Sequence, residues 1–143
     1  MHTIRTILKH KKSSEVWCVR PDDSVLEAIT LMAKLGIGAL VVVEDGQLVG
    51  ILSERDYARK IILQGKRSAE TRVAEIMTRE VATASLDTTA QQGLAMMTNG
   101  FFRHLPIMED GKMVGLVSIG DLVKAVIADQ QATIEELERY VTS

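Results

Sequence analysis

The chain has 143 residues, of which 46% are hydrophobic and 25% are charged, and its formal net charge is −2 at pH 7. This length predicts one compact domain, and the near-neutral charge provides no positive field to attract nucleic acid or an anionic membrane surface. The longest apolar run, residues 39–43, is too short to span a membrane, and residues 1–6 lack the apolar segment of a secretory signal. The single cysteine excludes an internal disulfide. We therefore expect a soluble cytoplasmic protein without nucleic-acid or membrane partners.

The first half of the chain predicts a strand, a helix, a hairpin and a second helix. Residues 1–12 are polar and basic and predict a solvated arm, whereas residues 16–20 are apolar and predict a short strand. The next helix is indicated by one apolar stripe at spacings of four, three and four residues, formed by Val25, Ile29, Met32 and Gly36. Two further strands, 39–43 and 48–52, flank the hairpin signal Asp45-Gly46. Ser53 then caps a helix that we expect to run to about Leu63.

The second half repeats this order after a polar linker at residues 64–72. A short helical turn, a first strand, a helix, a hairpin and a closing helix are predicted in sequence at residues 73–77, 81–84, 88–99, 103–117 and 119–128. A separate amphipathic helix is predicted at 133–141, with a capping box at Thr133 and Glu136. The fold class is therefore α+β, in two β-α-β-β-α repeats related by a pseudo-twofold axis and followed by a C-terminal helix. The predicted boundaries are 1–12 for the arm, 13–66 for the first repeat, 67–128 for the linker and second repeat, and 129–143 for the C-terminal helix.

Two segments about 65 residues apart carry the duplication. Residues 40–56 read LVVVEDGQLVGILSERD and residues 105–121 read LPIMEDGKMVGLVSIGD, so eight of the seventeen positions are identical. Most of the mismatches exchange one apolar residue for another. A duplication of this kind predicts two similar subdomains and two related binding sites.

Each of these segments ends in the same phrase, Gly-x-x-Ser-x-x-Asp, in which Ser53 precedes Asp56 and Ser118 precedes Asp121. One interpretation is structural, because a serine followed three residues later by an acidic residue is typical of a helix N-cap. The other interpretation is functional. The N-terminus of a helix favours a phosphate, and an ionised carboxylate accepts hydrogen bonds from two donors, such as the vicinal hydroxyls of a ribose. The phrase is thus half of a possible nucleotide site.

The order of elements, their duplication and the two Gly-x-x-Ser-x-x-Asp phrases resemble a pair of cystathionine-β-synthase-like (CBS) domains over residues 13–128. The linker phrase Val73-Ala74-Glu75-Ile76-Met77-Thr78 is also typical of that family. The resemblance implies adenosyl ligands such as AMP, ADP, ATP, S-adenosylmethionine or NAD in two clefts between the repeats. It also implies homodimers that regulate an attached or associated effector protein in response to metabolite or energy state.

The resemblance also implies which residues form the two sites. Ser118 and Asp121 would form one site with Val16, Trp17 and Cys18, with Ile37, Gly38 and Ala39, and with Lys12 or Ser13. Ser53 and Asp56 would form the other site with Thr78, Val81, Ala82 and Phe102. Arg103 and His104 lie where family members often place a basic residue against phosphate. The first repeat has Gly38-Ala39 at that position, so we expect the two sites to differ chemically.

Other residues have ordinary interpretations. Cys18 lies in an apolar strand and is expected to be an inert buried thiol. Charges such as Arg55, Arg59 and Lys60 often only solvate a helix. If Arg55 and Arg59 share a helix face that borders the Asp56 site, they would suit the longer phosphate chain of NAD or ATP, and the Asp121 site would suit AMP. His2, His10 and His104 are scattered, so no metal-ligand spacing is present, and no nucleophile–base pair is evident.

Three hypotheses follow from the sequence. The first is a stand-alone, non-catalytic regulatory module that binds adenine nucleotides. The second is a structural dimerisation module whose Ser-x-x-Asp phrases are only helix caps. The third is an enzyme that uses Asp56 or Asp121 as a general base. A homodimer is expected because the two closing helices present more apolar residues than one small domain buries, unless the helix from Thr133 covers them. These residues are Tyr57, Ile61 and Ile62 in one helix, and Leu122, Val123, Val126 and Ile127 in the other.

Overall fold

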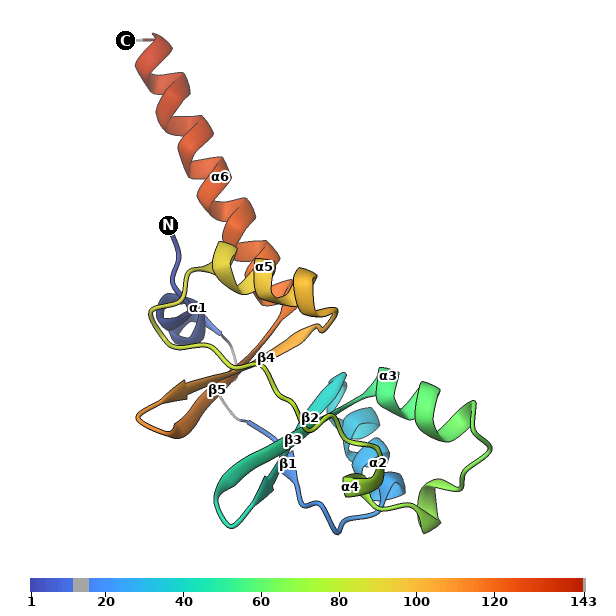
Figure 1. The fold of residues 1–143 in the computed structure, drawn as a ribbon. Coiled ribbons are helices and arrows are strands. Elements are labelled where there is room, and N and C mark those ends of the chain that lie inside the picture. The colour runs from blue at the N-terminus through green and yellow to red at the C-terminus, as the bar shows by residue number, and fades with distance from the viewer. Residues whose placement is uncertain (12–15, 143) are drawn as a thin grey trace. The chain divides into compact units, whose positions relative to one another are not determined.

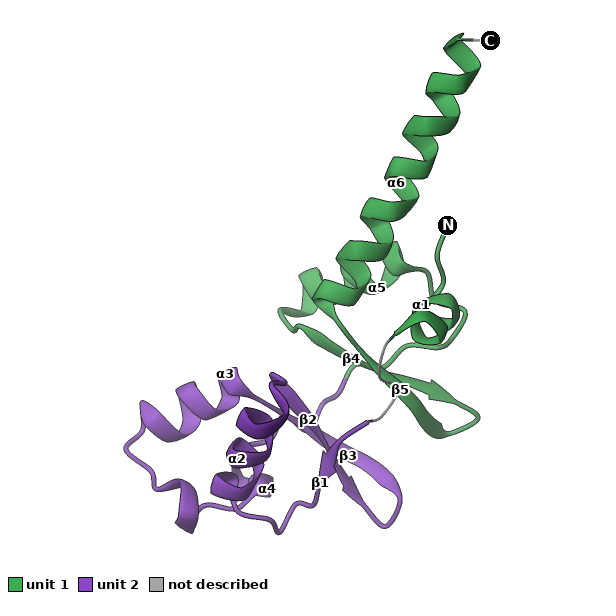
Figure 2. Ribbon diagram, turned by 180° about the vertical axis from the view of Figure 1, so that it is seen from behind, with its two compact units in different colours: residues 1–14, 82–143 green, residues 15–81 purple. Residues whose placement is uncertain are grey.

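A computed structural model describes residues 1–11 and 16–142 of the chain. The chain divides into two compact units, coloured separately in Figure 2. Unit 1 comprises residues 1–14 and 82–143, and unit 2 comprises residues 15–81. Within the described residues, no helix has both the length and the apolar character needed to cross a membrane.

Unit 2 is built around a three-stranded sheet in the order β1-β2-β3 (Figure 1). Strand β1 (Cys18–Val19) runs parallel to β2 (Ala39–Glu44), and β2 pairs antiparallel with β3 (Gln47–Ser53). Helix α2 (Val25–Leu35) connects β1 to β2. After β3 come α3 (Glu54–Tyr57), the π-helix η1 (Ala58–Ile62), the 3-10 helix η2 (Ser68–Glu70) and α4 (Val73–Ile76).

Unit 1 repeats this plan with a reduced sheet. Strands β4 (His104–Glu109) and β5 (Lys112–Ser118) form an antiparallel hairpin between α5 (Ala90–Gly100) and α6 (Ile119–Thr142), and α1 (Ile4–His10) packs in the same unit. The strand expected at residues 81–84 is only one parallel bridge, from Ala84 to Ile107. The equivalent bridge in unit 2 joins Val19 to Val42 and belongs to β1. Ala82 and Ala84 stand where unit 2 has Trp17 and Val19, and alanine has a lower preference for strands than tryptophan or valine, which accounts for the shorter pairing.

The β2–β3 and β4–β5 hairpins have the same strand pairing at equivalent positions. Ala39 pairs with Ser53 and His104 with Ser118, and the pairing shifts once in each hairpin, between Val42 and Val43 and between Ile107 and Met108. Asp45 and Asp110 both have φ of 51°, and the glycine after each has φ of 77°. Two successive positive φ values are the signature of the type I′ turn that Asp-Gly favours, so the predicted hairpin signal is confirmed in both units.

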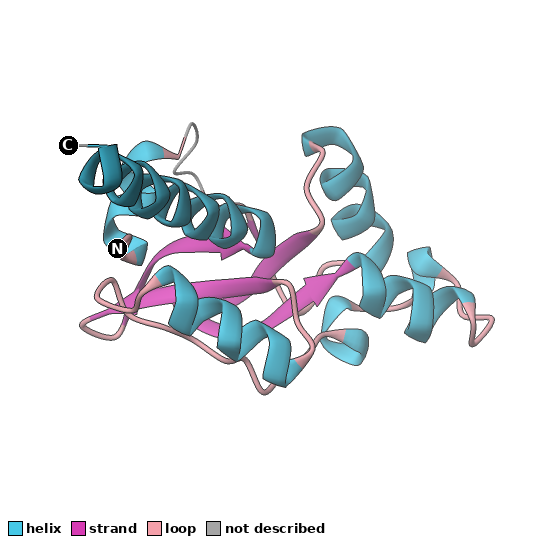
Figure 3. Cartoon of the chain, turned by 90° about the horizontal axis from the view of Figure 1, so that it is seen from above, coloured by secondary structure: helices cyan, strands magenta, loops and turns pink. Residues whose placement is uncertain are grey.

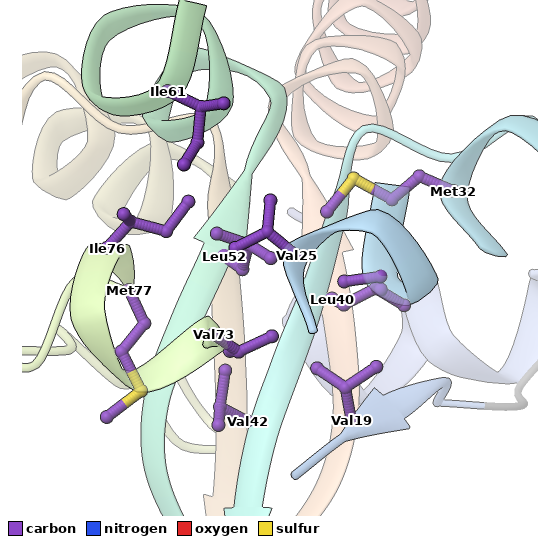
Figure 4. Packing of buried hydrophobic residues seen from close by; sticks show 11 residues of the cluster. Val19, Val25, Met32, Leu40, Val42, Leu52, Ile61, Val73, Ile76 and Met77 are labelled. Carbon is purple, nitrogen blue, oxygen red and sulfur yellow. The ribbon is translucent and has the colours of Figure 1, made fainter. Parts of the chain in front are cut away.

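Each unit has its own hydrophobic core. In unit 2, helix α2 and the β2–β3 hairpin pack through fully buried side chains that include Val25, Leu40, Val42 and Leu52, seen in Figure 4. Ile61 of η1 and Val73 and Ile76 of α4 complete this cluster. In unit 1 the equivalent cluster is formed by Ile4, Ile7, Ala90, Met97, Leu105, Ile107, Val117, Leu122 and Ala125. The expectation that Ile61 and Leu122 belong to a dimer surface is therefore wrong, because both are core residues.

The N-terminal segment is not a solvated arm. Residues 4–10 form helix α1, capped by Thr3, with Ile4 and Ile7 buried. The amides of Ile4 and Arg5 donate to the carbonyls of Thr88 and Leu86, just as those of Val73 and Ala74 in α4 donate to Asp23 and Pro21. Helix α1 therefore makes in unit 1 the same kind of backbone hydrogen bonds that α4 makes in unit 2. The apolar spacing Ile4, Ile7, Leu8 matches Val73, Ile76, Met77, but the neighbouring basic residues obscured it.

The C-terminal region is one helix and not two. Helix α6 continues without interruption from Ile119 to Thr142 (Figure 3). The hydroxyl of Thr133, expected to cap a separate helix, instead donates to the carbonyl of Asp129 at 3.0 Å, the bond a threonine makes in a helix interior. No proline interrupts these residues. The helix from Thr133 is thus a continuation of α6 and does not fold back over it.

The glycine of each Gly-x-x-Ser-x-x-Asp phrase provides room for a neighbouring segment. A Cβ atom on Gly50 would lie 2.7 Å from Sδ of Met77 and 3.0 Å from the carbonyl oxygen of Thr78. A Cβ atom on Gly115 would lie 2.8 Å from Cδ1 of Leu8. Thr78 is bridged to Ile51 by two backbone hydrogen bonds of 2.8 and 3.0 Å. The glycines thus allow residues 77–78 and α1 to close against the hairpins of their own units.

We predict that Gly50→Ala destabilises the protein by about 1–3 kcal/mol, the usual cost of overpacking. Gly115→Ala should cost less, because its added methyl group meets only the flexible end of Leu8, whereas the methyl group at Gly50 meets backbone. The matched control is Gly120→Ala in the first turn of α6, where the nearest atom would be Oγ of Ser118 at 3.6 Å. That control should be neutral or stabilise by up to ~1 kcal/mol. Urea unfolding measures the free energy of unfolding of the three variants. Equal stability of Gly50→Ala and Gly120→Ala would contradict the prediction.

Candidate functional site

Both Ser-x-x-Asp phrases form capping boxes where a strand leads into a helix. In unit 2 the Ser53 amide donates to Oδ2 of Asp56 at 3.0 Å, and the Asp56 amide donates to Oγ of Ser53 at 3.2 Å. In unit 1 the corresponding bonds between Ser118 and Asp121 are 2.8 and 3.2 Å. The structural interpretation of the phrase is therefore confirmed. It does not exclude the functional one, because a carboxylate has acceptor capacity for more than one donor.

The first turns of α3 and α6 have fewer amides for a phosphate than the sequence suggested. The amide of Glu54 donates to the carbonyl of Gly38 at 3.0 Å, and the amide of Ile119 donates to the carbonyl of Arg103 at 2.9 Å. The third amide of each turn is bound by the cap serine. Neither helix start is thus a phosphate site by itself, and the side chains around each carboxylate become the more important groups.

Asp56 is surrounded by donors from three parts of unit 2. Nζ of Lys60 lies 3.1 Å from Oδ1 of Asp56 and also donates to the carbonyl of Ile76 at 2.8 Å. The hydroxyl of Thr78 lies 3.3 Å from Oδ1, and the hydroxyl of Ser53 lies 3.1 Å from Oδ2. The lysine, expected only to solvate its helix, thus neutralises the Asp56 carboxylate and ties it to the end of α4.

Asp121 has a lysine partner of a different origin. Nζ of Lys11, which follows α1, donates to Oδ2 of Asp121 at 3.0 Å and to the carbonyl of Leu116 at 2.9 Å. Burial, the largest single influence, disfavours the charged carboxylate. The hydrogen bonds from the Ser118 amide and Lys11, with the positive charge of Lys11, outweigh it and hold the pKa of Asp121 below the ordinary value of 3.8. Asp121 is therefore an ionised acceptor at neutral pH.

The two units thus reach the same arrangement with different side chains. In unit 2, α4 and the bridge to Ile51 carry Thr78 to Asp56, and Lys60 comes from the turn after α3. In unit 1, α1 carries Lys11 to Asp121 from the other end of the chain. The two aspartates therefore differ in the origin of their lysine partners, whereas the chemical difference expected between the two ligand sites stays a prediction.

The remaining predicted residues of unit 2 lie in several surroundings. Gly38 and Ala39 adjoin Ser53, through the carbonyl bond to Glu54 and the strand pairing of Ala39. Ile37 packs against the hydrophobic core of unit 2, and Val16 and Val81 are partly buried. Trp17 is 42% exposed and Cys18 is exposed. The prediction of a buried Cys18 thiol is therefore wrong, because only Val19 of the two-residue strand β1 faces the core.

The predicted residues of unit 1 divide between core and surface. Ala82 and Phe102 pack against the hydrophobic core of that unit. Arg103 is exposed, and its backbone carbonyl supports the start of α6. His104 is partly buried and pairs with Ser118 in the β4–β5 register.

Lys12 and Ser13 lie outside the described residues, and the lysine that contacts Asp121 is Lys11. Sequence reasoning missed both Lys11 and the pairing of Lys60. Lys60 is four residues after Asp56, a spacing that places opposite charges together on a helix and was available as a signal. For Lys11, no local signal exists, since its partner is 110 residues away. Over residues 1–11 and 16–142, no three His, Cys, Asp or Glu side chains are placed to hold a metal ion.

We predict that Lys11→Met raises the pKa of Asp121, because it removes a hydrogen bond and an attractive charge. A lowered folded-state pKa means that ionised Asp121 adds stability that is fully present above the ordinary value of 3.8 and is lost as the pH falls through the folded value. In Lys11→Met, the loss of stability as the pH falls should therefore be smaller than in the wild type. Carbon-detected NMR of the Asp121 carboxyl group during acid titration measures the midpoint, with Lys9→Met as control. An unchanged Asp121 midpoint in Lys11→Met would contradict the assignment.

Comparison with known proteins identifies the architecture. A sequence model described as the CBS domain matches residues 5–63 and 73–128. A curated relative, the CBS domain-containing protein CBSX3, mitochondrial, of Arabidopsis thaliana, is 40% identical over 97% of this chain and 71% of its own. The solved structure of a CBS-domain protein from Burkholderia ambifaria MC40-6 is 48% identical, with a TM-score of 0.86 over 90% of this chain and 96% of its own.

A further solved structure carries ligands. The CBS domain pair of protein MJ0100, in complex with 5′-methylthioadenosine and S-adenosyl-L-methionine, is 27% identical to this chain. Its TM-score is 0.78 over 90% of this chain and 98% of its own. The fold class predicted from sequence, α+β in two repeats, is confirmed by these matches, and the predicted C-terminal helix is the continuation of α6. The chain belongs to the CBS domain family and carries two CBS repeats.

Proposed function

We propose that this protein is a non-catalytic regulatory module that binds adenine nucleotides such as AMP, ATP or NAD through Asp56 and Asp121. The observation that carries the proposal is the pair of equivalent carboxylates, each partly buried at a strand–helix junction and each bonded to a lysine. A carboxylate of this kind suits the two hydroxyls of a ribose, and a neighbouring ammonium group suits a phosphate. The adenosine ligands of the MJ0100 domain pair support the same ligand class.

Ligand binding would act on an effector protein by population shift. A ligand that binds one arrangement of the chain more tightly than another raises the population of that arrangement, which a partner can recognise. The cytoplasmic location and the homodimer stay predictions, and the Arabidopsis relative is named as a mitochondrial protein.

The structural alternative also has an observation in its favour, namely the two complete capping boxes. In that case the serines and aspartates stabilise the helix starts and no ligand is needed. The enzyme hypothesis has less support, because the lowered pKa of Asp121 makes this carboxylate a weak proton acceptor.

The sequence predicts that Arg55 and Arg59 share one face of an α-helix. In the structure α3 ends at Tyr57, and Arg59 lies in the π-helical turn η1. Lys60 is also already bound to Asp56. The preference of the Asp56 site for NAD or ATP and of the Asp121 site for AMP therefore stays a prediction.

We predict that Asp56→Asn and Asp121→Asn each weaken nucleotide binding. Asparagine keeps an oxygen that can accept the serine amide, so the helix cap is largely retained, but the charged acceptor is lost. Loss of a charged hydrogen bond costs roughly 1.5–3 kcal/mol, which corresponds to about ten- to a hundred-fold in affinity. Isothermal titration calorimetry with AMP, ATP and NAD measures the change in each variant.

The matched control is Asp110→Asn in the β4–β5 turn, where asparagine tolerates the left-handed backbone of φ 51°. This variant should bind nucleotide like the wild type. If the double variant Asp56→Asn, Asp121→Asn also binds like the wild type, the ligand is held elsewhere. If the wild-type protein binds none of the three nucleotides, the structural alternative is the better account.

A further inference from the structure

Helix α6 presents a second apolar surface that does not face the core of unit 1. We name as the α6 stripe the residues Val123, Ile127, Ile134, Leu137 and Val141, which are 39%, 59%, 48%, 60% and 82% exposed. Their spacings of four, seven, three and four residues place them on one side of an α-helix. The core of unit 1 is contacted instead by Leu122 and Ala125, which are buried. Gln130 is the polar residue within the stripe.

The stripe continues beyond the body of unit 1. Residues 130–142, named here the α6 extension, are all exposed, and this part of the helix projects past α1, α5 and the β4–β5 hairpin (Figures 1 and 2). A lone helical segment of this length is marginally stable in water, and helices in proteins normally gain their stability from packing of an apolar face. The extension cannot fold back on its own unit, because α6 is continuous from Ile119 to Thr142.

The charges beside the stripe indicate what covers it. Lys124 and Glu138 are exposed and lie on the same side of the stripe. They are 14 residues apart, about 21 Å along the helix, so they cannot pair within one chain. In two antiparallel copies of α6, Lys124 of each copy would lie beside Glu138 of the other. In a parallel pair, Lys124 of one copy and Glu138 of the other would lie on opposite flanks of the shared stripe and 14 residues apart along it, so these two charges could not pair.

Four of the five stripe residues follow nearly the same symmetry, and Ile134 would lie opposite Gln130 of the other copy. Val123 and Val141, and likewise Ile127 and Leu137, are equally distant from position 132, and Lys124 and Glu138 are equally distant from position 131. An antiparallel pair centred there would set Val123 against Val141 and Ile127 against Leu137 of the other copy. Each extension would then cover the exposed stripe residues near the start of the other α6. Surfaces that match themselves under a twofold rotation are those of a symmetric dimer.

We propose that α6 is the dimerisation element of this protein, and that two copies pair their α6 stripes in antiparallel orientation. The inference rests on the proposed self-association and names its surface, and it does not depend on nucleotide binding. The proposed dimer surface keeps Val123 and Ile127 from the surface expected from sequence and adds the α6 extension. It leaves out Ile61 and Leu122, which are core residues.

The first experiment places a charge within the stripe. Leu137→Glu should raise the dissociation constant of the dimer by about ten-fold or more, as loss of a central apolar contact does. Ala132→Glu adds the same charge to the same helix but lies nine residues after Val123, two and a half turns, and so on the opposite face. That control should dimerise like the wild type. Sedimentation equilibrium measures the dissociation constants, and far-UV circular dichroism verifies that both variants are folded.

The second experiment tests the orientation by charge exchange. Lys124→Glu and Glu138→Lys should each weaken the dimer by roughly two- to fivefold at low salt, because an attraction becomes a repulsion. The double variant Lys124→Glu, Glu138→Lys should restore the wild-type constant. Failure of this rescue would overturn the antiparallel orientation. A wild-type monomer at high concentration would overturn the whole inference, whereas a dimer unaffected by Leu137→Glu would leave self-association standing and overturn the role of α6.

Discussion

The carboxylate in the first turn after each hairpin connects the parts of its unit. Asp56 bonds at once to the end of β3, to Thr78 beyond α4 and to Lys60 after α3. Asp121 bonds to the end of β5 and to Lys11 beyond α1. Because burial disfavours a charge that has no partner, each carboxylate requires these donors to be in place. Residues 77–78 pack at Gly50 and α1 packs at Gly115, which brings Thr78 and Lys11 to the two carboxylates.

The same junction serves both stability and the proposed ligand. A ribose that binds Asp56 or Asp121 must share the carboxylate with a lysine that already occupies one of its oxygens. A phosphate on the ligand would offer that lysine a second anionic partner, so a phosphorylated nucleoside suits the junction better than a neutral one. Since the lysines come from different segments in the two units, such binding would act on η1 in one unit and on the residue after α1 in the other.

Repetition explains why so much of this fold could be predicted from the sequence. The strands, the Asp-Gly turns and the helices after Ser53 and Ser118 were recognisable because the second copy repeats the first in order and spacing. Features that occur once or depend on distant partners were not. The role of α1 was hidden by its basic neighbours, and Lys11 meets Asp121 only through the fold. The exposure of Cys18 depends on β1 having just two residues, and the continuity of α6 depends on Thr133 bonding within the helix.

The central claim, that both Ser–Asp junctions are parts of adenine-nucleotide sites, is tested most directly by residue-resolved NMR. A titration with AMP, ATP or NAD would be followed at the backbone amides of Ser53, Asp56, Ser118 and Asp121. These amides form the capping boxes, so a ribose that binds the carboxylates must change their surroundings. The account predicts saturable shifts at the amides of both junctions. Nucleotide binding that leaves all four amide signals unchanged would contradict it.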